Sequence, residues 1–77
     1  MTIKTLERIH RLLQEDFEKR TNALEIARKA KHDAEDAIEY QEADPAQFKD
    51  VFSLYDYEYR AKMAAEDALD DFETQQF

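Results

Sequence analysis

The two histidines have the widest chemical range in this chain, because imidazole can act as an acid, a base or a metal ligand. His10 follows Glu7 by three residues, which is the Glu-x-x-His spacing of di-iron helical bundles. Such a site takes two copies of this motif and further glutamates from four helices, and this chain has one copy. We therefore interpret His10 as a half-buried core residue rather than a metal ligand.

The second histidine, His32, stands close to Asp33, Glu35 and Asp36. On a helix, residues three and four positions apart lie on the same side, so these groups are expected to form ordinary surface ion pairs. The single serine, Ser53, has no acyl-transfer motif around it. Neither group predicts a catalytic or a metal site.

Several other chemistries are excluded by composition. The chain has no cysteine and no glycine, so it holds no disulfide, no thiolate metal site and no glycine-rich phosphate loop. The basic cluster of Arg28, Lys29 and Lys31 is flanked by acids and has no interleaved aromatic residues, so we expect no direct nucleic-acid binding. We predict no cofactor, no metal and no enzymatic activity within one chain.

The elements that position these residues are predicted by a heptad pattern on either side of the only proline, Pro45. Before Pro45, one core series is Ile3, His10, Phe17, Leu24, Lys31 and Ile38, and the other is Leu6, Leu13, Arg20, Ala27, Ala34 and Gln41. After it, the two series are Phe48, Tyr55, Lys62 and Leu69, and Val51, Glu58, Ala65 and Phe72. The sequence therefore predicts two long helices that face each other.

The join between the helices has strong local signals. Asp44 is a good N-cap, Pro45 suits the first helical position, and Gln47 completes a capping box. We predict a single domain over residues 1–77, with a helix at about 3–43, a turn at 43–46 and a helix at about 46–75. The fold class is all-α, an antiparallel two-helix hairpin that is coiled-coil-like with an alanine-rich seam.

Two alternatives remain at this stage. Asn22 after Thr21, with Glu25 three residues later, resembles a helix cap and would divide the first helix. The unbroken heptad phase favours one continuous helix. The aromatic alternation within residues 52–59 is typical of a strand, but helical patterning flanks it on both sides.

A fold at residue 44 predicts a register and an oligomer. It places Lys19 and Arg20 near Asp70 and Asp71, and it leaves the start of the longer first helix beyond the end of the second. The overhang would expose apolar side chains that a second chain could cover, so we expect a homodimer that forms a helical bundle. The predicted oligomer interface is Ile3, Leu6, Ile9, Leu12 and Leu13.

Charge points to a partner. The net charge is −8; residues 1–32 hold eight basic and five acidic side chains, whereas residues 33–77 hold three and fourteen. Three carboxylates near the end of the second helix have no role in folding, and a basic protein is their natural partner. The predicted partner-binding residues are Tyr57, Asp67, Asp70 and Asp71.

The functional prediction follows from these features. With no apolar segment long enough for a membrane span and no signal-peptide pattern, we expect a cytoplasmic protein without membrane contact. The chain is interpreted as a small acidic interaction module, an adaptor or accessory protein that self-associates. The alternative is an inhibitor that mimics nucleic acid, using the carboxylates of Glu66, Asp67, Asp70, Asp71 and Glu73.

Overall fold

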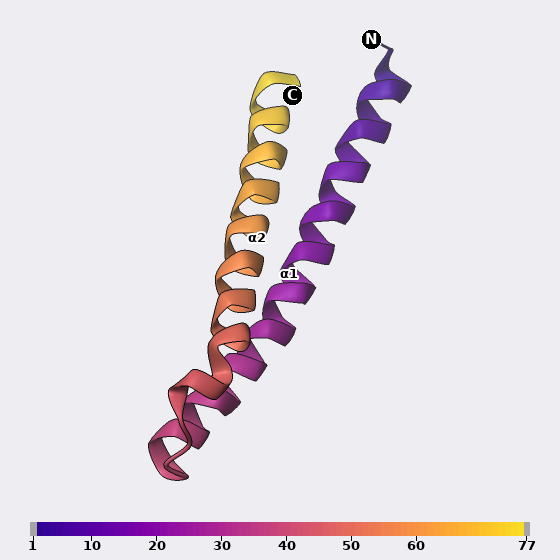
Figure 1. Cartoon of the computed structure of the whole chain (residues 1–77). Helices are drawn as coiled ribbons and strands as arrows, with labels where there is room; N and C mark the ends of the chain where they lie inside the picture. Colours follow the sequence, from indigo (N-terminus) through magenta and orange to yellow (C-terminus); the bar gives the residue numbers. More distant parts are fainter. Residues whose placement is uncertain (1, 77) are drawn as a thin grey trace.

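The computed structural model describes residues 2–76, which form two helices that pack against each other (Figure 1). Helix α1 spans Ile3–Tyr40 and helix α2 spans Lys49–Gln76, with a short 3₁₀-helix, η1, at Pro45–Phe48 between them. The helices run antiparallel, so the turn lies at one end of a rod 58 Å long and both chain ends lie at the other. The predicted all-α helical hairpin is confirmed.

Helix α1 is continuous through Thr21 and Asn22, where the sequence resembles a helix cap. Thr2 caps its start, with Oγ1 accepting a hydrogen bond of 3.2 Å from the amide of Thr5. The hydroxyl of Thr21 donates to the carbonyl oxygen of Phe17 at 2.9 Å, the usual way for a threonine to be satisfied inside a helix. Residues 52–59 are helical as well, and the described residues 2–76 contain no strand.

The turn is tighter than the sequence predicts. Helix α1 ends at Tyr40, three residues before the expected boundary, and the amides of Gln41 and Ala43 both donate to the carbonyl of Ala37, at 3.0 and 3.1 Å. Between these amides, Glu42 has a φ of 56°. This left-handed conformation favours glycine, which the chain lacks, and it costs other residues about 1–2 kcal/mol.

Asp44 caps the second segment as expected, but the segment begins as a 3₁₀-helix. Its Oδ1 accepts a hydrogen bond of 3.0 Å from the amide of Ala46, and its carbonyl accepts one of 3.0 Å from Gln47. A 3₁₀-helix rises about 2.0 Å per residue against 1.5 Å in an α-helix. Because of the 3₁₀ segment and the early end of α1, α2 extends further towards the N-terminus of α1 than a fold at residue 44 predicts.

The register shows this shift. The side chain of Lys31 lies over the Tyr55 ring, and His10 contacts Glu73 at 2.9 Å. The pairing predicted for Arg20 with Asp70 and Asp71 is wrong, because Glu73 already lies beside His10, ten residues or roughly 15 Å before Arg20. Arg20 instead pairs with Asp16 in its own helix, at 3.6 Å.

The core of the hairpin is thin. Among residues 2–76, the buried hydrophobic side chains are Ala27, Ala34 and Ala65, with exposed fractions of 2%, 3% and 8%. Small side chains at a helix contact let the two backbones approach closely. The larger apolar residues at the predicted core positions, such as Phe17 and Leu24, remain half-buried. Folding of one chain therefore leaves much apolar surface in contact with water.

Candidate functional site

His10 joins the two helices by two contacts. Its Nε2 lies 2.9 Å from Oε1 of Glu73, in position to donate to the carboxylate, and its ring stacks on Phe72 with centroids 5.8 Å apart. The side chain is half-buried, as its core position predicted. The partner on α2 was not predicted, because it depends on the register rather than on the residues near His10.

Two lysines occupy predicted core positions, and each places its charged group over an aromatic ring. The Nζ of Lys31 lies 4.2 Å from the centroid of the Tyr55 ring, and that of Lys62 lies 5.6 Å from the Phe17 ring. Lys62 also pairs with Glu66 at 2.9 Å. Long cationic side chains can lay their stems on apolar surface and place their charge over an aromatic face. The cations therefore contribute to the helix contact.

One carboxylate between the helices has an unsatisfied atom. The Oε2 of Glu58 is buried and has no hydrogen-bond partner among the described residues. It borders a depression of about 380 Å³ that is also lined by Asp16, Lys19, Arg20 and Ala23. A buried acceptor without a partner costs about 1–3 kcal/mol, so Glu58 weakens the hairpin.

The histidine and basic cluster in the second half of α1 forms an open surface. Arg28, Lys29, His32 and Asp33 line a depression of about 500 Å³, and all four belong to one helix. Arg28 pairs with Glu25 at 2.8 Å. Within residues 2–76, no three histidine or acidic side chains come together in a group that could hold a metal ion. The His32 ring lies 4.0 Å from Asp36, so Arg28 and His32 each make a surface ion pair within α1.

The predicted partner-binding residues are exposed but do not form one group. Asp67, Asp70 and Asp71 lie together near the end of α2, and none of them makes an ion pair within the described chain. Tyr57 is 61% exposed and precedes Asp67 by ten residues, roughly 15 Å along the helix axis. The acidic group thus stands apart from the tyrosine.

The predicted oligomer-interface residues are also divided. Ile3 and Leu12 are exposed, whereas Leu6, Ile9 and Leu13 are half-buried. Because α2 reaches His10 through Glu73, the chain from Ile9 onward lies alongside α2. The expected overhang of α1 is therefore confined to its first turns, and it does not explain the exposure of Leu12.

A row of exposed apolar residues along α1 was missed. Leu12, Ile26 and Tyr40 are 55%, 72% and 75% exposed and stand fourteen residues apart, close to four whole turns of helix. They occupy the same heptad position. The signal was available in the sequence as a second periodic series, beside the one that faces α2.

Comparison with protein-family models, curated proteins and solved structures found no match to this chain. In the part of the chain that the structure describes, neither helix has the length and apolar character needed to cross a membrane.

Proposed function

We propose that this chain is a small non-enzymatic protein–protein interaction module, an adaptor or accessory protein that self-associates. The observation that carries the proposal is the imbalance between core and surface. Among residues 2–76, the three buried hydrophobic residues are alanines, while Ile3, Leu12, Ile26, Tyr40, Leu54 and Tyr57 are at least half exposed. Burying a large apolar side chain is worth about 1.5–3 kcal/mol, so covering this surface with a second chain favours assembly.

The experiment is sedimentation equilibrium of the full chain from 1 to about 100 μM, with helicity followed by circular dichroism over the same range. We expect a reversible dimer in a cytoplasm-like buffer, and helicity that rises with concentration. A folded monomer throughout this range would contradict self-association.

The acidic end of α2 is the second part of the proposal. Asp67, Asp70 and Asp71 place negative charge near the helix C-terminus, where the helix dipole prefers cations, so their charge costs stability. A basic protein surface would offset that cost. Screening over about 8–10 Å predicts that such binding weakens as salt rises through the physiological range.

A defined probe tests this part, namely an immobilised ten-residue lysine peptide. The triple variant Asp67→Asn, Asp70→Asn and Asp71→Asn should bind it more weakly than the native chain. The matched control is Glu15→Gln, Glu39→Gln and Asp56→Asn, which removes three exposed charges elsewhere. Equal binding by the two triple variants would show that only net charge matters and that this face is not a binding site.

A further inference from the structure

One side of the hairpin carries a second apolar surface that neither helix covers. On α1 it comprises the row of exposed residues and the small residues between them: Leu12, Ala23, Ile26, Ala30, Ala37 and Tyr40. Neighbours in this set are three, four, seven or eleven residues apart, which are the spacings of one helix face. We refer to this surface, together with its continuation on α2, as the apolar face.

Helix α2 continues the apolar face with Leu54, Tyr57, Ala61, Ala64 and Ala68. These residues hold the same heptad positions in α2 as the first set holds in α1, and Asp71 of the acidic group holds one of these positions as well. In an antiparallel helix pair, a two-fold axis perpendicular to the plane of the two helices exchanges one helix for the other. Residues at the same flanking heptad position therefore lie on the same side of the pair in both helices. The depression that runs from Asp16 and Ala23 to Glu58 of α2 opens on this side as well.

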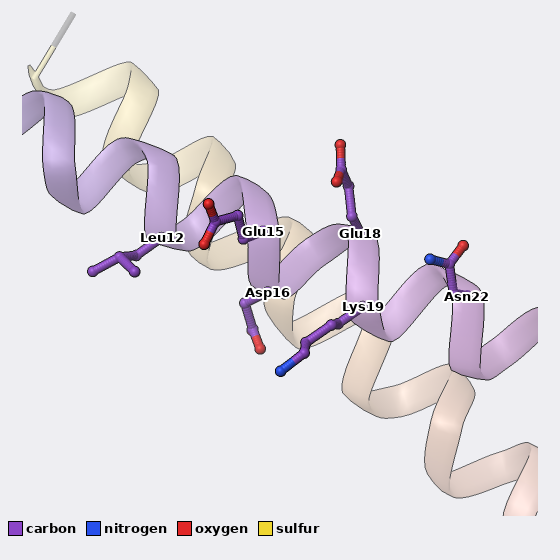
Figure 2. Close-up of a pocket in the computed structure, with 6 residues that line it drawn as sticks. All are labelled: Leu12, Glu15, Asp16, Glu18, Lys19 and Asn22. Atoms are coloured by element: carbon purple, nitrogen blue, oxygen red, sulfur yellow. The ribbon is translucent and has the colours of Figure 1, made fainter.

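The apolar face of α1 carries Asp33 at the heptad position of Ile26 and, nearer the start of the helix, one pair of opposite charges. Asp16 and Lys19 stand three residues apart, and Figure 2 shows their side chains on the same side of α1 as Leu12, with Glu18 and Asn22 pointing the other way. These residues line a depression of about 480 Å³. Asp16 also pairs with Arg20 at 3.6 Å, whereas Lys19 makes no ion pair within residues 2–76. When a second copy of the helix runs antiparallel, the acidic member of such a pair faces the basic member of the other copy, and the reverse holds as well.

Building on the proposed self-association, we propose that a second copy of the chain packs on the apolar face, with a two-fold axis between Asp16 and Lys19. Asp16 then faces Lys19 of the second copy. The same symmetry sets Leu12 against Ala23 and Ile9 against Ile26, so these large side chains near the axis meet apolar residues. All four helices run antiparallel to their neighbours, as in a four-helix bundle.

Helix α2 is compatible with an axis at the same height. Its alanines Ala64 and Ala68 face each other across a two-fold axis at residue 66. The contact of His10 with Glu73 aligns the two helices. The axis lies seven and a half residues from His10 on α1 and seven residues from Glu73 on α2. At 1.5 Å per residue, these two distances agree within about 1.5 Å. One rotation therefore serves both helices.

The apolar face is large enough for a stable dimer. With the axis between Asp16 and Lys19, the start of α1 lies roughly 22 Å from the axis, so the two copies overlap over roughly 44 Å. Across two helices, a width of roughly 20 Å, this gives about 900 Å² in projection for each chain. Stable interfaces bury about 800 Å² on each partner. Leu12, Ala23, Ile26 and Ala30 lie within the overlap, whereas Tyr40, roughly 34 Å from the axis, lies beyond it.

The test compares two glutamate substitutions on exposed positions of α1 by sedimentation equilibrium. Ile26→Glu places a charge on the apolar face, and Gln14→Glu places the same charge at an exposed position on the other flank of α1. We expect the dimer dissociation constant to rise at least tenfold for Ile26→Glu and to change less than threefold for Gln14→Glu. If both variants dimerise as the native chain does, this face is not the interface, although self-association stands. A monomeric native chain would overturn both.

Charge exchange locates the axis without altering the apolar residues. Lys19→Asp should weaken the dimer, because Asp16 of each copy then faces a second carboxylate. Adding Asp16→Lys to that variant restores opposite charges across the axis and should recover most of the affinity. A double variant as weak as the single one would overturn the placement of the axis. Both positions are exposed, so the helical fold of the chain persists in these variants.

Discussion

Glu58 offers the sharpest test of the helix contact, because its Oε2 is buried without a partner. Replacing Glu58 with methionine keeps the length of the side chain and removes the unsatisfied acceptor. The cost of such an acceptor is about 1–3 kcal/mol. Since the side chain is only half-buried, we expect Glu58→Met to raise the free energy of unfolding by about 1–2 kcal/mol.

The matched control is Glu66→Met on the same helix. Glu66 is also half-buried, but it pairs with Lys62 at 2.9 Å. Both variants lose one negative charge, so overall charge repulsion changes equally. Loss of a partly exposed ion pair costs about 0–1 kcal/mol, so Glu66→Met should be neutral or destabilising.

Urea unfolding followed by circular dichroism at one fixed protein concentration measures both effects. With a slope near 1 kcal/mol/M for a small protein, the midpoint should rise by about 1–2 M for Glu58→Met. A lower midpoint for Glu58→Met would refute the reasoning. It would mean that Arg20, which lines the same depression, stabilises the carboxylate more than its unpaired oxygen costs.

Two further substitutions test the close helix contact and the turn. Ala34→Leu should lower the free energy of unfolding by about 1–3 kcal/mol, because the site is 3% exposed and has no room for the larger side chain. An unchanged urea midpoint would show that the helices do not meet closely there. Glu42→Gly should raise stability by about 0.5–1 kcal/mol, since glycine adopts the φ of 56° without strain. Glu39→Gly, inside α1, is its control and should lower stability by about 1 kcal/mol, and equal melting temperatures for the two variants would contradict a strained turn.

Local features of the fold could be predicted from the residues that form them. The caps at Thr2 and Asp44 depend on one side-chain oxygen and a nearby amide. The heptad pattern likewise assigned Ala27 and Ala34 to the helix contact, where they are buried. In each case, the deciding interaction lies within a few residues or one helical period.

Features that depend on the turn geometry could not be predicted. No strong helix breaker separates Tyr40 from Pro45, so the end of α1 is decided by the left-handed Glu42. That early end shifts α2 along α1 and determines that His10 meets Glu73. The candidate surfaces depend on the same register. The oligomer interface was predicted from a long overhang of α1, and the structure does not support an overhang of that length.

The position of the single turn also orders the steps by which the chain folds. Lys31 and Tyr55 are 24 residues apart in sequence, whereas His10 and Glu73 are 63 apart. Closing the longer loop directly costs about 0.9 kcal/mol more entropy, by the logarithmic dependence on loop length. Contacts near the turn therefore form first and shorten the loop that each later contact must close. Stabilising the turn should accelerate folding, while substitutions near His10, at the open end, should mainly change the rate of unfolding.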